Sequence, residues 1–196
     1  MEKFAFILHP LSLQDMEHLS PLMRYIPDPI IEACLKMKKP FKVSHITGIK
    51  SPYAEAEGWF IGCPLTAKQM VELPEEFVMD RIIESGKVAQ ELGAKIVGLG
   101  AFTSIVGDAG ITVAKNLDIA VTSGNSYTVA TAIQGTKQAA RMMGKDLKEC
   151  RAVVVGATGS IGAASVRLLA KEVKHITLVA RHMGPLEELA QELIEQ

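Results

Sequence analysis

The sequence predicts an α/β protein, with an N-terminal α/β domain followed by the start of a second, Rossmann-like α/β domain. Two observations predict this class. Short apolar runs alternate with longer helical patterns, which is typical of a parallel sheet covered by helices. The apolar run at 153–155 then leads into glycines spaced as G-x-x-G-x-x-G, at Gly156, Gly159 and Gly162.

The composition excludes several classes of protein. The chain has 196 residues, of which 48% are hydrophobic, so it is not a disordered segment. Its formal net charge is −1 and its only basic cluster, 36–39, is short, so we expect no nucleic-acid partner. No apolar run is long enough to span a membrane. Cys34, Cys63 and Cys150 form no CxxC motif, and their odd number, with no signal-peptide pattern, indicates a cytoplasmic protein.

We assign residues 1–145 to the first domain, which would form one wall of the substrate cleft. Apolar runs and alternation predict strands at 4–8, 42–49, 58–62, 96–99 and 117–121. Capping residues, prolines and apolar spacing predict helices at 12–19, 28–37, 75–92 and 127–143. The clearest helix follows Pro74 and carries Glu75 and Glu76 in its first turn, and Gly93 suits its C-terminal end.

Residues 146–196 would begin the NADP-binding domain. We expect a strand at 151–156, the glycine turn, a helix, a strand at 175–180 and a helix at 185–194. One βαβ unit and a helix are much less than a complete Rossmann domain, so we expect a truncated domain or a natural protein that continues beyond Gln196. Exposed apolar sheet edges would then favour self-association, and we expect a homo-oligomer.

The glycine turn has the residue types that a dinucleotide requires. One glycine permits the sharp turn out of the strand, another lets the backbone approach the diphosphate, and the last allows close helix–strand packing. Free N–H groups at the helix start would hold the anion, with hydroxyl donors from Thr158 and Ser160. The alternative is a glycine-rich turn without a ligand. The expected cofactor-binding residues are Gly156, Thr158, Gly159, Ser160, Ile161, Gly162 and Arg181.

The end of the second strand predicts which dinucleotide binds. NAD-selective sites usually place an acidic residue there for the ribose hydroxyls, and none occurs between Lys174 and Pro185. Arg181 could instead stack on the adenine and pair with a 2′-phosphate. We therefore predict NADP(H) as the cofactor, the alternative being that Arg181 is an ordinary surface arginine.

Two loops that follow predicted strands are candidates for substrate binding. Thr103 and Ser104 follow one strand, and Asn125 and Ser126 follow another. Ligands of open α/β sheets bind beyond the carboxyl ends of the strands, where hydroxyl and amide groups could hold a carbonyl oxygen. The alternative for Asn125 and for Ser123 is helix capping. The Tyr-x-x-x-Lys pair of short-chain dehydrogenases and the metal-binding H-E-x-x-H pattern are absent.

Three motifs together resemble the long-chain acyl-(acyl-carrier-protein) reductases of cyanobacteria and their bacterial relatives. The motifs are 99–105 (LGAFTSI), 122–128 (TSGNSYT) and 154–162 (VVGATGSIG). The resemblance implies NADPH-dependent reduction of a fatty acyl thioester, bound to acyl carrier protein or CoA, to an aldehyde. It also implies that the acyl-accepting cysteine lies beyond Gln196, so that the fragment alone would be inactive. Cys63 is then expected to be a packed thiol.

The sequence therefore predicts an NADP-dependent oxidoreductase. Hydride would pass from the nicotinamide to a carbonyl carbon held at the loops of Thr103, Ser104 and Asn125. The partner would be a small-molecule or carrier-protein-bound acyl substrate. One alternative is a dehydrogenase of a small amino or hydroxy acid with a shikimate-dehydrogenase-like arrangement. A second is a non-catalytic NADP-binding module.

Overall fold

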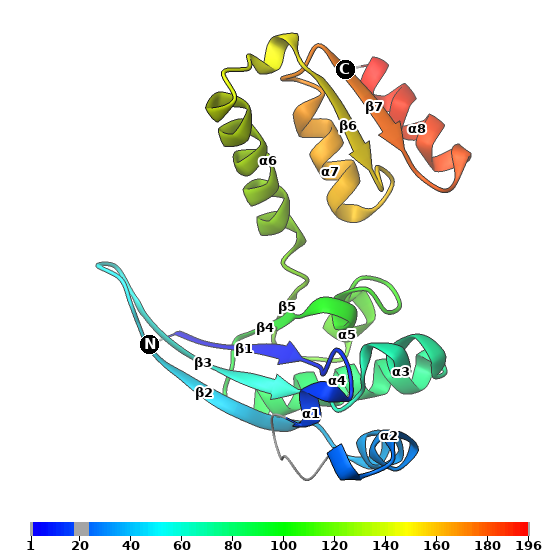
Figure 1. Ribbon diagram of the computed structural model, residues 1–196. Coiled ribbons are helices and arrows are strands. Elements are labelled where there is room, and N and C mark those ends of the chain that lie inside the picture. The colour runs from blue at the N-terminus through cyan, green and yellow to red at the C-terminus, as the bar shows by residue number, and fades with distance from the viewer. Residues whose placement is uncertain (1, 18–23, 196) are drawn as a thin grey trace. The chain divides into compact units, whose positions relative to one another are not determined.

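The computed structural model describes residues 2–17 and 24–195 and has the mixed α/β architecture that the sequence predicts (Figure 1). The chain divides into two compact units, Met1–Ser123 and Gly124–Gln196, each with its own sheet. The helix α6 (Asn125–Met142) belongs to the second unit, because it packs against α7 (Ser160–Leu169). The boundary that we place at residue 145 from the sequence would leave this helix in the first domain.

The first unit is built on a five-stranded sheet. Four strands are parallel, and at one edge β2 pairs antiparallel with β3, which correspond to the strands predicted at 42–49 and 58–62. The spatial order is β2 (Phe41–Lys50), β3 (Glu55–Gly62), β1 (Glu2–Leu8), β4 (Ile96–Leu99) and β5 (Ala120–Thr122). The predicted strand at 117–121 starts later, because the Asp118 N–H donates to Gln90 Oε1 at 2.9 Å instead of entering the ladder.

One face of this sheet carries the main hydrophobic core. Ile7 and Ile61 are fully buried and face α4 (Glu75–Glu91), whose Val78 and Ile82 are also fully buried. Side chains alternate across a strand, so the intervening residues of β1 and β3 lie on the opposite face. The predicted helix ends as expected, because Gly93 has φ 84° and its N–H donates to the Gln90 carbonyl.

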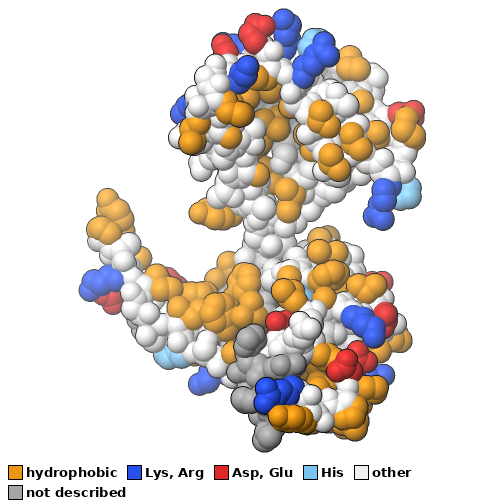
Figure 2. Space-filling model, in the orientation of Figure 1, with side chains coloured by type: hydrophobic (Ala, Val, Ile, Leu, Met, Phe, Trp, Pro, Cys, Tyr) orange, Lys and Arg blue, Asp and Glu red, His pale blue; other side chains and the backbone are white. Residues whose placement is uncertain are grey.

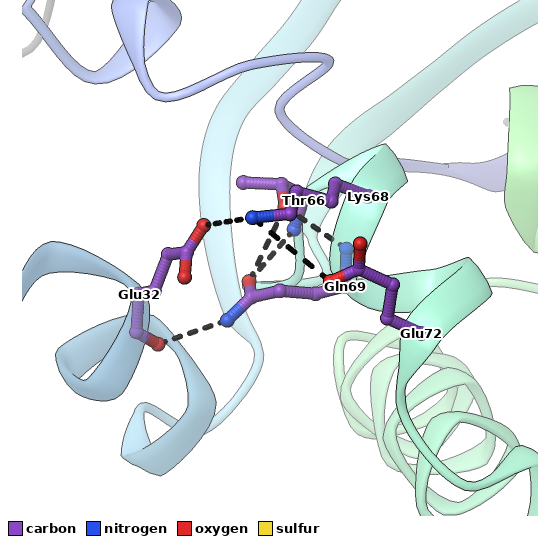
Figure 3. A network of polar contacts seen from close by, with 5 residues as sticks. All are labelled: Glu32, Thr66, Lys68, Gln69 and Glu72. Carbon is purple, nitrogen blue, oxygen red and sulfur yellow. Dashed lines mark hydrogen bonds and ion pairs between the residues drawn. The ribbon is translucent and has the colours of Figure 1, made fainter. Parts of the chain in front are cut away.

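The helices α2 (Asp28–Met37) and α3 (Ala67–Glu72) are joined by a buried polar network (Figure 3). Thr66 caps α3, with its Oγ1 accepting from the Gln69 N–H at 3.2 Å. The Gln69 amide donates to the Glu32 carbonyl at 2.9 Å. Lys68 forms an ion pair with Glu32 at 3.4 Å. The network therefore fixes α2 against α3. The sequence predicts α2 but does not predict α3.

Two further short helices complete the first unit. The helix predicted at 12–19 is observed as α1 (Gln14–Glu17), because residues 12 and 13 form a bend and turn before it, and residues 18 and 19 lie outside the described residues. The Asp15 carboxylate accepts from the Ser12 N–H at 3.0 Å, as expected for a capping residue. The helix α5 (Ile111–Lys115) follows Gly110 and buries Val113.

The second unit contains the predicted βαβ arrangement. β6 (Arg151–Val155) and β7 (His175–Val179) are parallel and in register from Arg151–His175 to Val155–Val179. Apolar side chains from α6, α7 and α8 (Met183–Ile194) pack on one face of this pair. Val153 and Val155 lie on the other face and are 63% and 79% exposed. The self-association expected from exposed sheet edges stays a prediction.

Neither a metal centre nor a membrane span is found in the part of the chain that the structure describes. Within residues 2–17 and 24–195, no three His, Cys, Asp or Glu side chains are grouped so that they could hold a metal ion. No helix in these ranges combines the length and apolar character needed to cross a membrane.

Candidate functional site

The glycine turn begins where β6 ends, at the carboxyl edge of the two-stranded sheet. Gly156 has φ 78°, a left-handed conformation that side chains disfavour. Its N–H donates to the Val179 carbonyl at 2.8 Å, and the Ala157 N–H donates to the same carbonyl at 3.0 Å. The turn is therefore fixed to the end of β7. Nothing lies within 4 Å of the position that a Cβ of Gly156 would occupy, so the space above the turn is open.

The third glycine lets the helix approach the turn closely. A Cβ at Gly162 would lie 2.0 Å from the Gly156 carbonyl oxygen and 3.1 Å from the Ala157 Cα. Both are backbone atoms, which cannot rotate away as a flexible side chain can. Gly159 is the N-cap residue of α7, and its backbone N–H donates to the Gly156 carbonyl at 3.0 Å. The packing role that the sequence assigns to Gly162 is thus visible in the structure.

The first turn of α7 presents donors to the solvent side of the turn. The first N–H groups of a helix have no intrahelical acceptors, and they carry the positive end of the helix dipole. Thr158, Ser160 and Ile161 are all exposed there. The turn therefore offers backbone N–H groups and two hydroxyls, which together are suited to an anion such as a diphosphate.

Asn125 reaches this turn from another helix. Its side-chain Nδ2 donates to Ser160 Oγ at 2.8 Å. Asn125 is the first residue of α6, and Ser160 is the first residue of α7, so the contact brings two helix N-termini together. Because Ser160 Oγ accepts this bond, its own proton remains available for a ligand. The sequence predicts Asn125 as a substrate-binding residue, and the structure brings it to the glycine turn.

Arg181 lies two residues beyond β7, at the same sheet edge as the glycine turn. The register pairs Val155 with Val179, so both strands end together. Arg181 is exposed and makes no ion pair with a described residue. A guanidinium at this place is free to meet a phosphate group.

The loop of the first candidate substrate pair is held by local hydrogen bonds. Thr103 is 1% exposed, and its hydroxyl donates to the Gly100 carbonyl at 2.8 Å. The Ser104 hydroxyl donates to the Ala101 carbonyl at 2.7 Å. Both hydroxyl protons are therefore engaged within the 3₁₀ turn Ala101–Ser104. The carbonyl-binding role of this loop stays a prediction, as does that of the exposed Ser126 in the second unit.

The sequence does not single out the residue that anchors this loop. His9 follows β1, and its Nε2 accepts from the Phe102 N–H at 3.2 Å. Its Nδ1 lies 3.0 Å from the Pro10 carbonyl oxygen, so the ring proton resides on Nδ1. Both ring nitrogens are used, so His9 has a structural role in holding this loop. The contact spans 93 residues of sequence and leaves no local signal.

Cys63 is a packed thiol, as expected. It is fully buried at the end of β3. Burial raises the pKa of the Cys63 thiol to about 11, a value that the hydrogen bond with Ser85 lowers only in part. A thiol with this pKa is neutral and a weak nucleophile near neutral pH.

Comparison with known proteins supports the resemblance at the level of distant similarity. The chain is 27% identical to the long-chain acyl-[acyl-carrier-protein] reductase of Synechococcus elongatus, covering 97% of this chain and 59% of the reductase. It is 34% identical to the aminotransferase PigE of a Serratia species over 65% of this chain, which is 14% of that protein. No protein-family model matches the sequence. A crystal structure of an aspartate racemase homologue from Pyrococcus horikoshii aligns with a TM-score of 0.40 and 15% identity, covering 100% of this chain and 71% of that one.

Proposed function

We propose that the protein is an NADPH-dependent oxidoreductase that reduces a fatty acyl thioester to an aldehyde. The observation that carries the proposal is the contact of Asn125 with Ser160 at the glycine turn, where two helix N-termini meet. The distant similarity to the acyl-[acyl-carrier-protein] reductase, which extends over 97% of this chain, supports the substrate class. The chain spans 59% of that reductase, so the activity of the whole protein is part of the proposal.

The residues of the turn fit a dinucleotide diphosphate. No heavy atom lies within 4 Å of a Cβ position at Gly156, whereas a Cβ at Gly162 would meet backbone at 2.0 Å. The turn is thus open on the side that faces solvent and closed on the side that faces the helix. A diphosphate lying over Gly156 would meet the first N–H groups of α7 and the hydroxyl of Ser160.

Each group of this site has a separate task. Asn125 orients the Ser160 hydroxyl, so that its proton points to a phosphate oxygen. The guanidinium of Arg181 pairs with the 2′-phosphate that distinguishes NADPH from NADH. When bound, NADPH supplies one hydride to the thioester carbonyl carbon, and with one proton the products are an aldehyde and a free thiol. Catalysis of that step requires the carbonyl to be held and polarised. Ser126 is the candidate with an exposed hydroxyl, whereas the hydroxyl protons of Thr103 and Ser104 are engaged within their own turn.

The test is a reduction assay with the full-length protein. Loss of NADPH absorbance on addition of hexadecanoyl-CoA, with hexadecanal identified as the product, is the expected result. Oxidation of small hydroxy or amino acids instead would favour the dehydrogenase alternative. NADPH binding without turnover of any carbonyl compound would refute the enzymatic function and favour a binding module.

A further inference from the structure

The outward side of α2 is apolar, although it belongs to no core. Ile30 and Met37 are 54% and 75% exposed, and Ala33 and Cys34 between them are exposed as well. The four positions are spaced i, i+3, i+4 and i+7, so they form one stripe along the helix. We call Ile30, Ala33, Cys34 and Met37 the α2 stripe. Figure 2 shows hydrophobic side chains at the surface of α2, which lies at the lower edge of the first unit in Figure 1.

The α2 stripe is not the face by which this helix packs on the protein. That face consists of Ile31 and Leu35, which are buried in a small cluster with Leu13. Glu32 is also engaged with the protein, because it forms an ion pair with Lys68 at 3.4 Å. A surface helix normally carries polar residues away from its buried face. On α2 the apolar stripe takes that place, so a second apolar environment would match it.

A lysine cluster lies at the carboxyl end of the stripe. Segment 36–42 contains no acidic residue and four exposed lysines, which are Lys36, Lys38, Lys39 and Lys42. The Nζ of Lys36 lies 5.6 Å from the ring centre of Phe77. The Nζ of Lys38 lies 4.1 Å from the ring centre of Phe41. Such contacts cover the aliphatic stem of a lysine and keep its charge at the surface.

The carboxylates around the lysine cluster have other partners. Glu84 forms an ion pair with Arg81 at 2.7 Å, and the same guanidinium donates to the Lys36 carbonyl at 3.2 Å. The Asp15 carboxylate accepts from the Leu11 N–H at 2.7 Å. In the described ranges, no carboxylate forms an ion pair with a lysine of the cluster. This surface therefore carries an excess of positive charge beside an apolar stripe.

We propose that α2 and the lysine cluster bind the surface of an anionic lipid bilayer, with the α2 stripe inserted among the acyl chains. Helices of this kind lie in the plane of the interface, with their apolar face buried about 5–10 Å. Each lysine near an anionic surface adds about fivefold in affinity. An acidic protein would match the lysines, but the exposed stripe also requires an apolar layer. The proposal is independent of the glycine turn, which belongs to the second unit.

The test is a flotation assay of the full-length protein on lipid vesicles, made without NADPH. One set of vesicles contains phosphatidylglycerol and phosphatidylcholine in equal parts, and the other contains phosphatidylcholine alone. Met37→Gln replaces the 75% exposed methionine of the stripe by a polar side chain and leaves the charge unchanged. Lys38→Gln combined with Lys39→Gln removes two charges and leaves the stripe unchanged. All of these side chains are exposed, so the variants should fold.

Matched controls lie in the second unit. Met142→Gln makes the same change at a methionine of α6 that is 78% exposed. Lys145→Gln combined with Lys148→Gln removes two charges from exposed lysines. Because each control changes the same residue type as its test variant, the comparison separates the α2 surface from general surface charge and apolarity.

Cys34 reports whether the stripe enters the lipid. It is exposed, whereas Cys63 is buried, so a thiol reagent labels Cys34 selectively in protein that carries Cys150→Ser. The emission of the fluorophore acrylodan moves to shorter wavelength when its surroundings become apolar. We expect this blue shift at Cys34 on the anionic vesicles. The label placed at Met142→Cys, with Cys34→Ser and Cys150→Ser, should show no shift.

The wild type is expected to float with the anionic vesicles and not with phosphatidylcholine alone, and added salt should release it. Met37→Gln and the double variant of Lys38 and Lys39 should each weaken binding by about tenfold or more, with both controls close to the wild type. Absence of binding to the anionic vesicles would overturn the proposal. Binding that needs the lysines but neither Met37 nor a blue shift would overturn it too, and would indicate an acidic protein as the partner.

Discussion

Substitution of Gly162 by alanine tests whether close packing at this glycine shapes the cofactor turn. The added Cβ would lie 2.0 Å from the Gly156 carbonyl oxygen, so either α7 or the turn must move. Overpacking of this kind costs about 1–3 kcal/mol. Alanine recovers up to about 1 kcal/mol through its higher helix propensity. The expected net loss in the free energy of unfolding is therefore up to about 2 kcal/mol. Each kcal/mol lost should lower the melting temperature by roughly 4–8 °C for a unit of this size.

Gly135 provides the matched control. It lies inside α6, and no atom is within 4 Å of its Cβ position. Gly135→Ala should therefore stabilise the protein by about 0.5–1 kcal/mol. Circular dichroism during thermal unfolding measures stability, and NADPH fluorescence measures binding. We expect Gly162→Ala to weaken NADPH binding at least tenfold, which is about 1.4 kcal/mol. The packing argument is refuted if the two alanine variants behave alike in both measurements.

Three further predictions concern Asn125, Arg181 and Cys63. Asn125→Ala removes one hydrogen bond, worth about 1 kcal/mol, so NADPH and NADH should both bind about fivefold more weakly in fluorescence titrations. Thr136→Ala on the same helix should bind both cofactors normally, and a normal Asn125→Ala would exclude a positioning role. Arg181→Ala should weaken NADPH binding by about tenfold or more and leave NADH binding nearly unchanged, whereas equal losses would contradict NADP(H) selectivity. Burial raises the pKa of the Cys63 thiol from 9.0 to about 11, so the thiol loses its proton at lower pH in the unfolded chain than in the folded protein. The contribution of Cys63 to the free energy of unfolding should therefore be fully present below pH 9 and be lost between pH 9 and 11. In denaturant unfolding, the free energy of unfolding should fall by up to about 1.4 kcal/mol per pH unit over this range. Cys63→Ala should abolish this fall, and the same fall in the Cys63→Ala variant would contradict burial of the thiol as its cause.

The sequence predicts features that depend on local chemistry. The positive φ of Gly156 and the close packing of Gly162 follow from the turn that connects a strand to a helix. The end of α4 at Gly93 follows from the same conformational freedom. In these cases the residues that cause the structure are adjacent in the chain, so a local pattern is enough.

Contacts between distant residues could not be predicted in the same way. Asn125 and Ser160 are 35 residues apart, and their hydrogen bond depends on how α6 packs against α7. The late start of β5 depends on Gln90, a residue of α4 that bonds the backbone of Asp118. The contact of the Phe6 ring with Gly98 requires strand order and register, because the two residues meet only when β1 and β4 are neighbours. Each of these features is set by tertiary packing rather than by local pattern.

The most direct measurement of the central claim is an amide NMR titration with NADPH. We expect the N–H signals of the turn, from Gly156 to Gly162, to shift on addition of NADPH, together with the side-chain amide of Asn125. Amide signals of the distant Gly135 should stay in place. Saturable shifts confined to the turn and Asn125 would support the assignment of this site to NADP(H). If saturating NADPH leaves the signals of the turn and of Asn125 in place, or shifts only signals from other residues, the assignment of this site to NADP(H) is contradicted.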